Sequence, residues 1–264
     1  MSAPTLDEVL DLMHEIAPLE LAADWDNVGL LLRSDAKRDA VARCLLTIDL
    51  TDAVVAEAEA YSADLVISYH PPIFRPMARL DVGDATQRRI LAAVRAGYAV
   101  YSPHTALDAA AGGLADWLLD CALGEHVPSS VTACGEGEYG RVAQCSEPMS
   151  WQDLLQRLKQ RFSVPHLQIA RPDAAGDAVH SVAVAAGAGS GVLRGAAADV
   201  WVTGEMSHHD ALAAVAAGTS VILAGHSNTE RGYLSRLAER LREEFSDGLD
   251  VAVAERDRDP LTVV

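Results

Sequence analysis

Three of the nine histidines directly follow predicted strands, where a histidine side chain can do chemistry. His70 ends the segment DLVISYH, His104 ends YAVYSPH, and His226 ends SVILAGH. In an open α/β sheet, ligand-binding and catalytic groups lie beyond the carboxyl ends of the strands. One histidine at such a position is more often a hydrogen-bonded loop residue. Three of them together favour a functional site.

A carboxylate accompanies two of these histidines: Asp108 in HTALD and Glu230 in HSNTE. Imidazole nitrogen with carboxylate oxygen is a ligand set for zinc, manganese or iron, whereas calcium prefers oxygen ligands alone. One carboxylate can also bridge the two ions of a two-metal hydrolase. Each acid has a structural alternative. Asp108 could cap the following helix, and Glu230 could complete a capping box that begins at Ser227.

The segment TGEMSHHDA gathers Glu205, His208, His209 and Asp210 just after the predicted strand DVWVTG. One interpretation is a proton-transfer or substrate-binding cluster beside the metal site. The other is a polar helix N-terminus, with Ser207 as the cap and acidic residues favoured by the helix dipole. Both interpretations stay open at this point.

Two loops carry weaker signals. The turn GAGSG, residues 187–191, could offer backbone N–H groups to a phosphate, but a tight strand–helix turn is the favoured interpretation. It lacks both the full G-x-G-x-x-G pattern and a Walker lysine. In the loop WDNVG, Asp26 and Asn27 could face a site. The favoured interpretation there is a turn that Trp25 anchors in the core.

Alternating strands and helices must position these residues. Strands are expected at residues 41–49, 64–70, 98–104, 181–187, 199–204, 220–226 and 251–255. Helices are expected from a capping box at Thr5 and Glu8, after Thr51, and near residues 86–95, 114–121, 151–158, 208–218 and 232–245. This alternation predicts an α/β fold with mainly parallel sheets flanked by helices. The Gly-, Ser- and Glu-rich stretch 124–150 is interpreted as a linker or irregular crossover between two α/β modules.

Composition limits the classes of partner. The chain has 264 residues, 21 Lys and Arg against 38 Asp and Glu, and a formal charge of −17. Such acidity disfavours nucleic acids and anionic membranes as partners. We expect no signal peptide or membrane span, and therefore a cytoplasmic protein. The scattered cysteines are expected to be free thiols: Cys44, Cys121, Cys134 and Cys145.

Five segments occur in an order that resembles one family. They are ADWDNVGLLL, DLVISYHPPIF, YSPHTALDAAAGG, DVWVTGEMSHHDALAA and GHSNTERGYL. Together they resemble the Nif-three-like family (NGG-one interacting factor three), whose members are often described as GTP cyclohydrolase I type 2 homologues. The resemblance covers essentially the whole chain. It implies two similar α/β modules, a dinuclear metal centre in a cavity between them, and a homohexamer built as a trimer of dimers.

The resemblance also implies a ligand set. Matched residue by residue, the metal ligands are His70, Asp108, His226 and Glu230, with Glu230 as the bridge. Tyr69 stands where the family has the first histidine of a pair, and a neutral phenol is a far weaker ligand than imidazole. We therefore expect one or two divalent ions per subunit. The expected domains are a first module at 1–123, a second at 124–225, and a C-terminal segment, 226–264, that returns to the first module and completes the metal site.

These observations predict a metal-dependent hydrolase acting on a small anionic or nucleotide-like substrate. His104, Glu205, His208 and His209 are the candidates for moving protons. The alternative is a non-catalytic scaffold or metallochaperone that holds a metal and engages other proteins. The expected partners are an unidentified small molecule and further copies of the chain.

Overall fold

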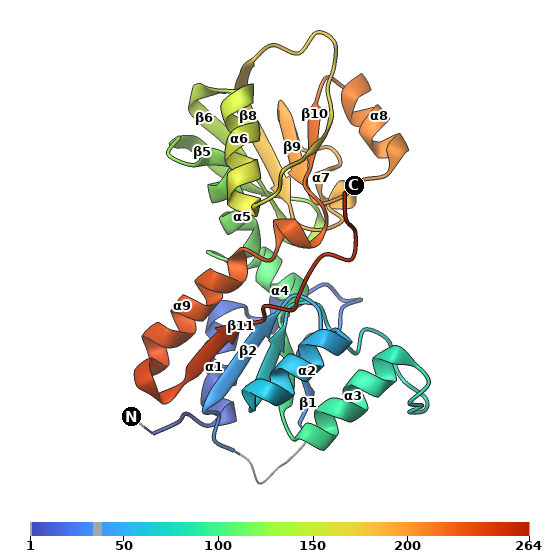
Figure 1. The fold of residues 1–264 in the computed structure, drawn as a ribbon. Coiled ribbons are helices and arrows are strands. Elements are labelled where there is room, and N and C mark those ends of the chain that lie inside the picture. The colour runs from blue at the N-terminus through green and yellow to red at the C-terminus, as the bar shows by residue number, and fades with distance from the viewer. Residues whose placement is uncertain (1, 34–38, 264) are drawn as a thin grey trace. The chain divides into compact units, whose positions relative to one another are not determined.

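The computed structural model describes residues 2–33 and 39–263, and these form two compact units (Figure 1). Unit 1 comprises Met1–Leu107 and Tyr233–Arg258. Unit 2 comprises Asp108–Gly232 and Asp259–Val264. Each unit has its own sheet, and helices flank both sheets. The predicted α/β fold class is therefore confirmed.

Unit 1 is built on a five-stranded sheet in the order β1-β4-β3-β2-β11. Its strands are β1 (Gly29–Leu32), β2 (Arg43–Thr47), β3 (Leu65–Ser68), β4 (Ala99–Ser102) and β11 (Asp250–Val253). The pairs β11–β2, β2–β3 and β3–β4 are parallel, and β1 joins β4 antiparallel. Every residue of β3 and β4 is buried, as expected for apolar strands of a parallel sheet.

Most helices of unit 1 begin near the starts that the sequence predicts, but the helix at His104–Ala109 was not predicted. The helices are α1 (Leu6–Ile16), α2 (Asp52–Tyr61), α3 (Ala85–Ala96) and α9 (Tyr233–Phe245), with the first residues of α4 (His104–Ala109). The capping box of Thr5 and Glu8 opens α1, and Thr51 caps α2. Gly97 ends α3 in the left-handed conformation. Short 3-10 turns lie at Leu19–Leu21 and Ser246–Gly248.

Unit 2 has a six-stranded sheet in the order β5-β6-β8-β9-β10-β7. Its strands are β5 (Pro128–Cys134), β6 (Gly140–Ser150), β7 (Gln168–Ala170), β8 (Ala178–Ala185), β9 (Val200–Thr203) and β10 (Ser220–Leu223). Only β8–β9 and β9–β10 are parallel among its neighbouring pairs. The remaining pairs are antiparallel, so this sheet is more mixed than the sequence suggests.

The linker interpretation of residues 124–150 is wrong. This stretch forms the antiparallel pair β5–β6, with a 3-10 turn at Glu136–Glu138 between the strands. Gly135 and Gly137 adopt positive φ angles of 80° and 75°, which glycine tolerates best. Most of β5 is exposed at the edge of the sheet. Its polar composition therefore resembles that of a loop.

Helices cover both faces of the unit 2 sheet, and they are α5 (Leu114–Leu123), α6 (Trp151–Phe162), α7 (Ser190–Leu193) and α8 (His208–Ala216) (Figure 1). Successive strand residues point to opposite faces. Accordingly, Val182 and Val184 share a core with residues of α5 and α6. Ala183 and Ala185 pack in a second core with Leu193 of α7 and residues of α8.

The structure also bears on the predictions about membrane spans and cysteines. Among the helices in the described residues, none is long and apolar enough to cross a membrane. All four cysteines are free thiols, as predicted. Burial raises the pKa of the Cys44 thiol far above its ordinary value, which keeps that sulfur uncharged.

Candidate metal centre

In unit 1, three neighbouring parallel strands deliver polar side chains to one edge of the sheet. Asp49 follows β2, His70 follows β3, and His104 follows β4. His70 Nδ1 lies 3.0 Å from Asp49 Oδ1. The rings of His70 and His104 are 5.4 Å apart and nearly perpendicular. The strand-end rule thus correctly predicts that these two histidines meet.

His104 is held by a buried carboxylate. Its Nδ1 lies 2.8 Å from Asp26 Oδ1, and Asp26 Oδ2 accepts bonds from the backbone N–H and hydroxyl of Thr105. Burial alone would raise the pKa of Asp26, but the hydrogen bonds from His104 and Thr105 outweigh it and lower that pKa. The favoured interpretation of this loop was wrong, because Trp25 is 64% exposed rather than anchored in the core.

The backbone at His104 is strained. Its φ is 26°, in a region that residues with a Cβ rarely occupy. Such a conformation costs roughly 1–3 kcal/mol and persists when surrounding contacts fix it. Asp26 supplies those contacts through the imidazole and through Thr105. The structure therefore holds this histidine in one place and one orientation.

Unit 2 repeats the arrangement at the ends of β8, β9 and β10. Glu205 follows β9 and His226 follows β10. His226 Nδ1 lies 3.0 Å from Glu205 Oε1, and His226 Nε2 lies 3.3 Å from Glu230 Oε1. Glu230 is 1% exposed, so its carboxylate is buried beside the imidazole. Buried acids of this kind are rare unless they are paired or bind a metal.

Gly187, which follows β8, makes room for this pair. A Cβ at Gly187 would lie 2.7 Å from Glu230 Oε1 and 2.9 Å from His226 Nε2. The N–H of Gly187 donates to Thr229 Oγ1, and that of Gly189 donates to Thr203 Oγ1. These two amides are therefore engaged within the protein. The phosphate-binding interpretation fails for them, and the tight-turn interpretation fits.

The capping interpretations of both acidic ligand candidates are wrong. Ser227 opens a 3-10 turn, Ser227–Thr229, which has no side-chain cap, and its hydroxyl donates to Asp259 instead of capping. Asp108 lies inside α4, partly buried, while Gly113 occupies the N-cap of the following helix α5. Neither Glu230 nor Asp108 is thus explained as a helix cap.

The cluster TGEMSHHDA divides between two roles. Ser207 caps α8 by accepting from the N–H of Asp210, as the structural interpretation predicts. The hydrogen bond from Ser207 and the neighbouring Arg194 lower the pKa of Asp210. His208 and His209 are exposed, with their rings 5.4 Å apart. Glu205, by contrast, contacts a site histidine, because its Oε1 lies 3.0 Å from His226 Nδ1.

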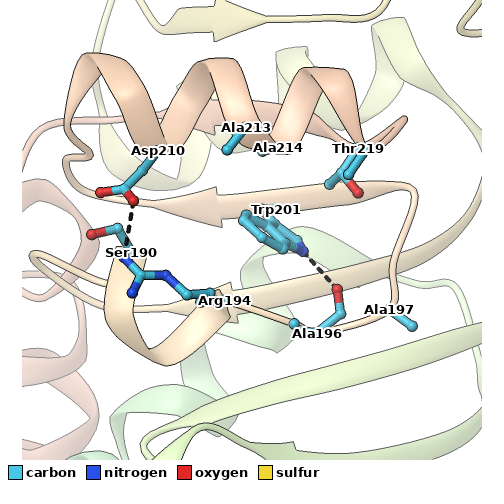
Figure 2. A pocket seen from close by; sticks show the side chains of 11 residues that line it. Ser190, Arg194, Ala196, Ala197, Trp201, Asp210, Ala213, Ala214 and Thr219 are labelled. Carbon is cyan, nitrogen blue, oxygen red and sulfur yellow. Dashed lines mark hydrogen bonds and ion pairs between the residues drawn. The ribbon is translucent and has the colours of Figure 1, made fainter.

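A cavity of about 390 Å³ lies between α7, α8 and β9 in unit 2 (Figure 2). Arg194 and Asp210 form an ion pair of 3.0 Å across it, and the Trp201 indole N–H donates to Ala196 O. Small side chains, including Ala213 and Ala214, complete its wall. The surface of this cavity is therefore mainly apolar.

One pattern is common to the site histidines. In His70, His104 and His226 alike, Nδ1 faces a carboxylate. A carboxylate at Nδ1 favours the tautomer that presents the Nε2 lone pair, the arrangement typical of metal-ligating histidines. Asp49 was not predicted as a site residue, although it directly ends the predicted strand 41–49.

The donor atoms also fit a metal ion. Two ligands about 2.1 Å from a tetrahedral ion lie roughly 3.4 Å apart, close to the 3.3 Å between His226 Nε2 and Glu230 Oε1. Within unit 2, His226 and Glu230 thus offer two donor atoms that one metal ion could bind. Tyr69 is buried, and its ring lies 4.9 Å from that of His70.

Comparison with known proteins gives the family. A family model described as Duf34/NIF3 (NGG1p interacting factor 3) matches residues 4–260. The chain is 41% identical to the Protein NIF3 homolog of Schizosaccharomyces pombe, over 93% of both chains. It is 36% identical to NGG1-interacting factor 3 of Saccharomyces cerevisiae, over 98% of this chain and 96% of that protein.

Solved structures share the fold at lower identity. A Bacillus cereus protein related to NIF3 superimposes with a TM-score of 0.82 at 19% identity, over the full length of both chains. Reduced HcgD from Methanocaldococcus jannaschii also gives a TM-score of 0.82, at 22% identity, over 95% of this chain and 98% of that one. From its sequence match and its fold, the chain belongs to the Duf34/NIF3 family.

Proposed function

We propose that this chain is a metal-dependent hydrolase acting on a small anionic or nucleotide-like substrate. The observation that carries the proposal is the shared pattern of the histidines, each with Nδ1 fixed by a carboxylate. That pattern orients imidazoles for metal binding and is more specific than the presence of histidine alone.

The proposed ligands are His70, Asp108, His226 and Glu230. Asp49 and Glu205 orient His70 and His226 through the contacts at Nδ1. Glu230 is the proposed bridge, and its burial supports this role because an anion in an apolar setting needs cationic neighbours. With Tyr69 in place of a histidine, a first ion is expected to bind more tightly than a second.

A divalent ion would supply Lewis-acid activation of water and of the substrate. His104 is the proposed proton-transfer group, because Asp26 fixes its ring and the ring lies 5.4 Å from that of His70. Glu205 is a further candidate through its contact with His226. His208 and His209 are proposed to exchange protons with solvent, since both are exposed at the start of α8.

Metal analysis of the purified protein tests the ligand set. After loading with zinc, manganese or iron and removal of excess ion, wild type should retain one or two equivalents. Glu230→Gln and His226→Ala should lose most of this metal, while the exposed control Glu147→Gln should retain it. Equal and negligible metal in all four proteins would overturn the proposal.

A broad hydrolase screen tests the reaction. Metal-loaded wild type is assayed against phosphoesters, amides and nucleotides, GTP included. Turnover that requires the metal and falls in His104→Ala, with metal content unchanged, would support the assigned proton transfer. Complete inactivity of metal-loaded wild type across the screen would contradict catalysis.

A second candidate function is a non-catalytic metal-binding scaffold or metallochaperone. Tyr69 favours it, because a phenol is a weaker metal ligand than the imidazole that it replaces. The name of the yeast relative, NGG1-interacting factor 3, also points to protein partners. Transfer of the bound metal to an acceptor, in the absence of any turnover, would favour this candidate. Metal-dependent turnover that is lost in His226→Ala would exclude it.

We further propose that the chain assembles as a homohexamer, a trimer of dimers. The support is the family resemblance. Light scattering of the purified protein at several concentrations measures the mass directly. A mass of one subunit, about 28 kDa, at every concentration would contradict the assembly.

A further inference from the structure

Three rings of unit 1 form a cluster at the carboxyl edge of its sheet. The ring centroids of Trp25 and Phe74 are 6.1 Å apart. His104 lies 6.2 Å from Trp25 and 6.4 Å from Phe74. All three pairs meet edge to face, at interplanar angles of 66° to 81°. The rings thus enclose a corner rather than a flat stack.

The two larger rings of this corner are exposed. Trp25 is 64% exposed and Phe74 is 43% exposed, although each has a large apolar surface. Leaving that surface in water forfeits the free energy that burial of an aromatic side chain provides. Contiguous exposed apolar surface of this kind marks a binding site more often than scattered single residues do.

Hydrogen bonds hold the corner in place. Asp26 is fixed by His104 and Thr105, and the N–H of Ala23 also donates to Thr105 Oγ1. The Asn27 side-chain amide donates to the carbonyl of Ile73, next to Phe74. The loop of Trp25 and the segment of Phe74 are therefore tied to each other. Rings fixed in advance lose little conformational entropy when a ligand binds.

The corner borders the proposed metal ligands. The His104 ring lies 5.4 Å from the ring of His70 and 5.4 Å from that of Tyr69. A ligand resting on Trp25 would thus place its remaining groups near His104 and His70. The aromatic corner and the proposed metal ligands would then contact the same ligand molecule.

We propose that Trp25, Phe74 and His104 recognise a planar heteroaromatic ring, such as the purine of a nucleoside. This inference rests on the proposed function, whose substrate class it narrows. Base–aromatic stacking needs no ionic attraction, which suits a chain with a formal charge of −17. The exposed Trp25 ring provides the stacking face, and Phe74 and His104 close two sides.

Equilibrium dialysis with adenosine tests this inference, because adenosine carries the ring without a phosphate. Wild type should bind adenosine and not ribose. Trp25→Ala should weaken adenosine binding by about 5- to 150-fold, the range seen when one stacking partner is removed. Trp25→Phe should recover most of the affinity. Leu212→Ala, at an exposed apolar residue of unit 2, is the matched control and should bind as wild type does.

The outcomes separate this inference from the metal proposal, since bound metal is measured on the same samples. Wild type that binds metal but no adenosine overturns the ring site alone. Adenosine binding without metal uptake supports the ring site and overturns the ligand set. If Trp25→Ala changes the oligomeric mass and leaves adenosine affinity intact, Trp25 is a subunit contact and the inference is wrong.

Discussion

At the residue scale, Gly187 shows how a missing side chain shapes the candidate centre. A Cβ there would overlap both Glu230 Oε1 and His226 Nε2. We predict that Gly187→Ala lowers metal affinity by about 10- to 100-fold, the loss typical when groups that orient metal ligands are disturbed. Its φ of 56° adds a backbone penalty of roughly 1–2 kcal/mol. Competition with a metallochromic chelator measures the affinity.

A matched control is available at Gly176. A Cβ there meets no atom within 4 Å, and the residue is exposed. Gly176→Ala should therefore bind metal as wild type does. Equal metal affinity in Gly187→Ala and Gly176→Ala would mean that the close approach of Gly187 does not matter to the site.

The buried carboxylate of Asp26 gives a pH-dependent prediction. Its pKa lies below the ordinary 3.8, so the ionised form stabilises the folded state. This contribution is present above about pH 4 and is lost as the pH falls through the lowered pKa. Asp26→Asn should destabilise the protein at pH 6, and the difference from wild type should shrink toward pH 3. Urea unfolding across this range measures it.

The opposite trend, a gap that widens on acidification, would contradict the assigned direction of the Asp26 pKa. Asp24→Asn is a suitable control, because it changes the same type of residue two positions away. It should not reproduce the loss expected of Asp26→Asn, because Asp24 is exposed and His104 and Thr105 contact Asp26 instead.

The residue scale also shows what sequence can predict. His70 meets Asp49 and His104, and Glu205 meets His226, because neighbouring parallel strands end at one edge, which the order of the segments already implies. The contact of Asp26 with His104 could not be predicted in this way. It joins a loop to a strand end 78 residues later, and no periodic pattern encodes that pairing.

At the element scale, α8 offers a test of the capping interpretation. Ser207 accepts from the N–H of Asp210 at the helix start. Ser207→Ala should lower the free energy of unfolding by about 0.5–2 kcal/mol, whereas Ser207→Asn, another good N-cap, should retain most of it. Thermal unfolding followed by circular dichroism compares the three proteins. Metal content should be the same in all of them, and a loss of metal in Ser207→Ala would show that the cap also supports the site.

Helices and strands could be predicted where a buried face produces a regular spacing of apolar residues. The amphipathic helices α1, α6 and α9 and the buried strands β3 and β4 follow directly from their patterns. The pair β5–β6 was mistaken for a linker because an exposed edge strand has no buried face to create alternation. The short strands β1 and β7 were missed, since three or four residues carry too little pattern.

At the scale of the whole molecule, the acidity belongs to the surface rather than to the site. Two of the 38 acids are proposed ligands, so 21 − 36 still leaves −15. A surface of that charge repels polyanions and raises the local concentration of cations near the protein. This favours uptake of a divalent ion over binding of a nucleic acid.

Metal loading should also stabilise the chain as a whole. A ligand that binds only the folded state adds about 2.7 kcal/mol at a concentration 100 times its Kd. Calorimetry should therefore show a higher Tm for wild type with metal than without it. Glu230→Gln should show a smaller rise in Tm or none. An unchanged wild-type Tm at saturating metal would contradict binding to the folded state.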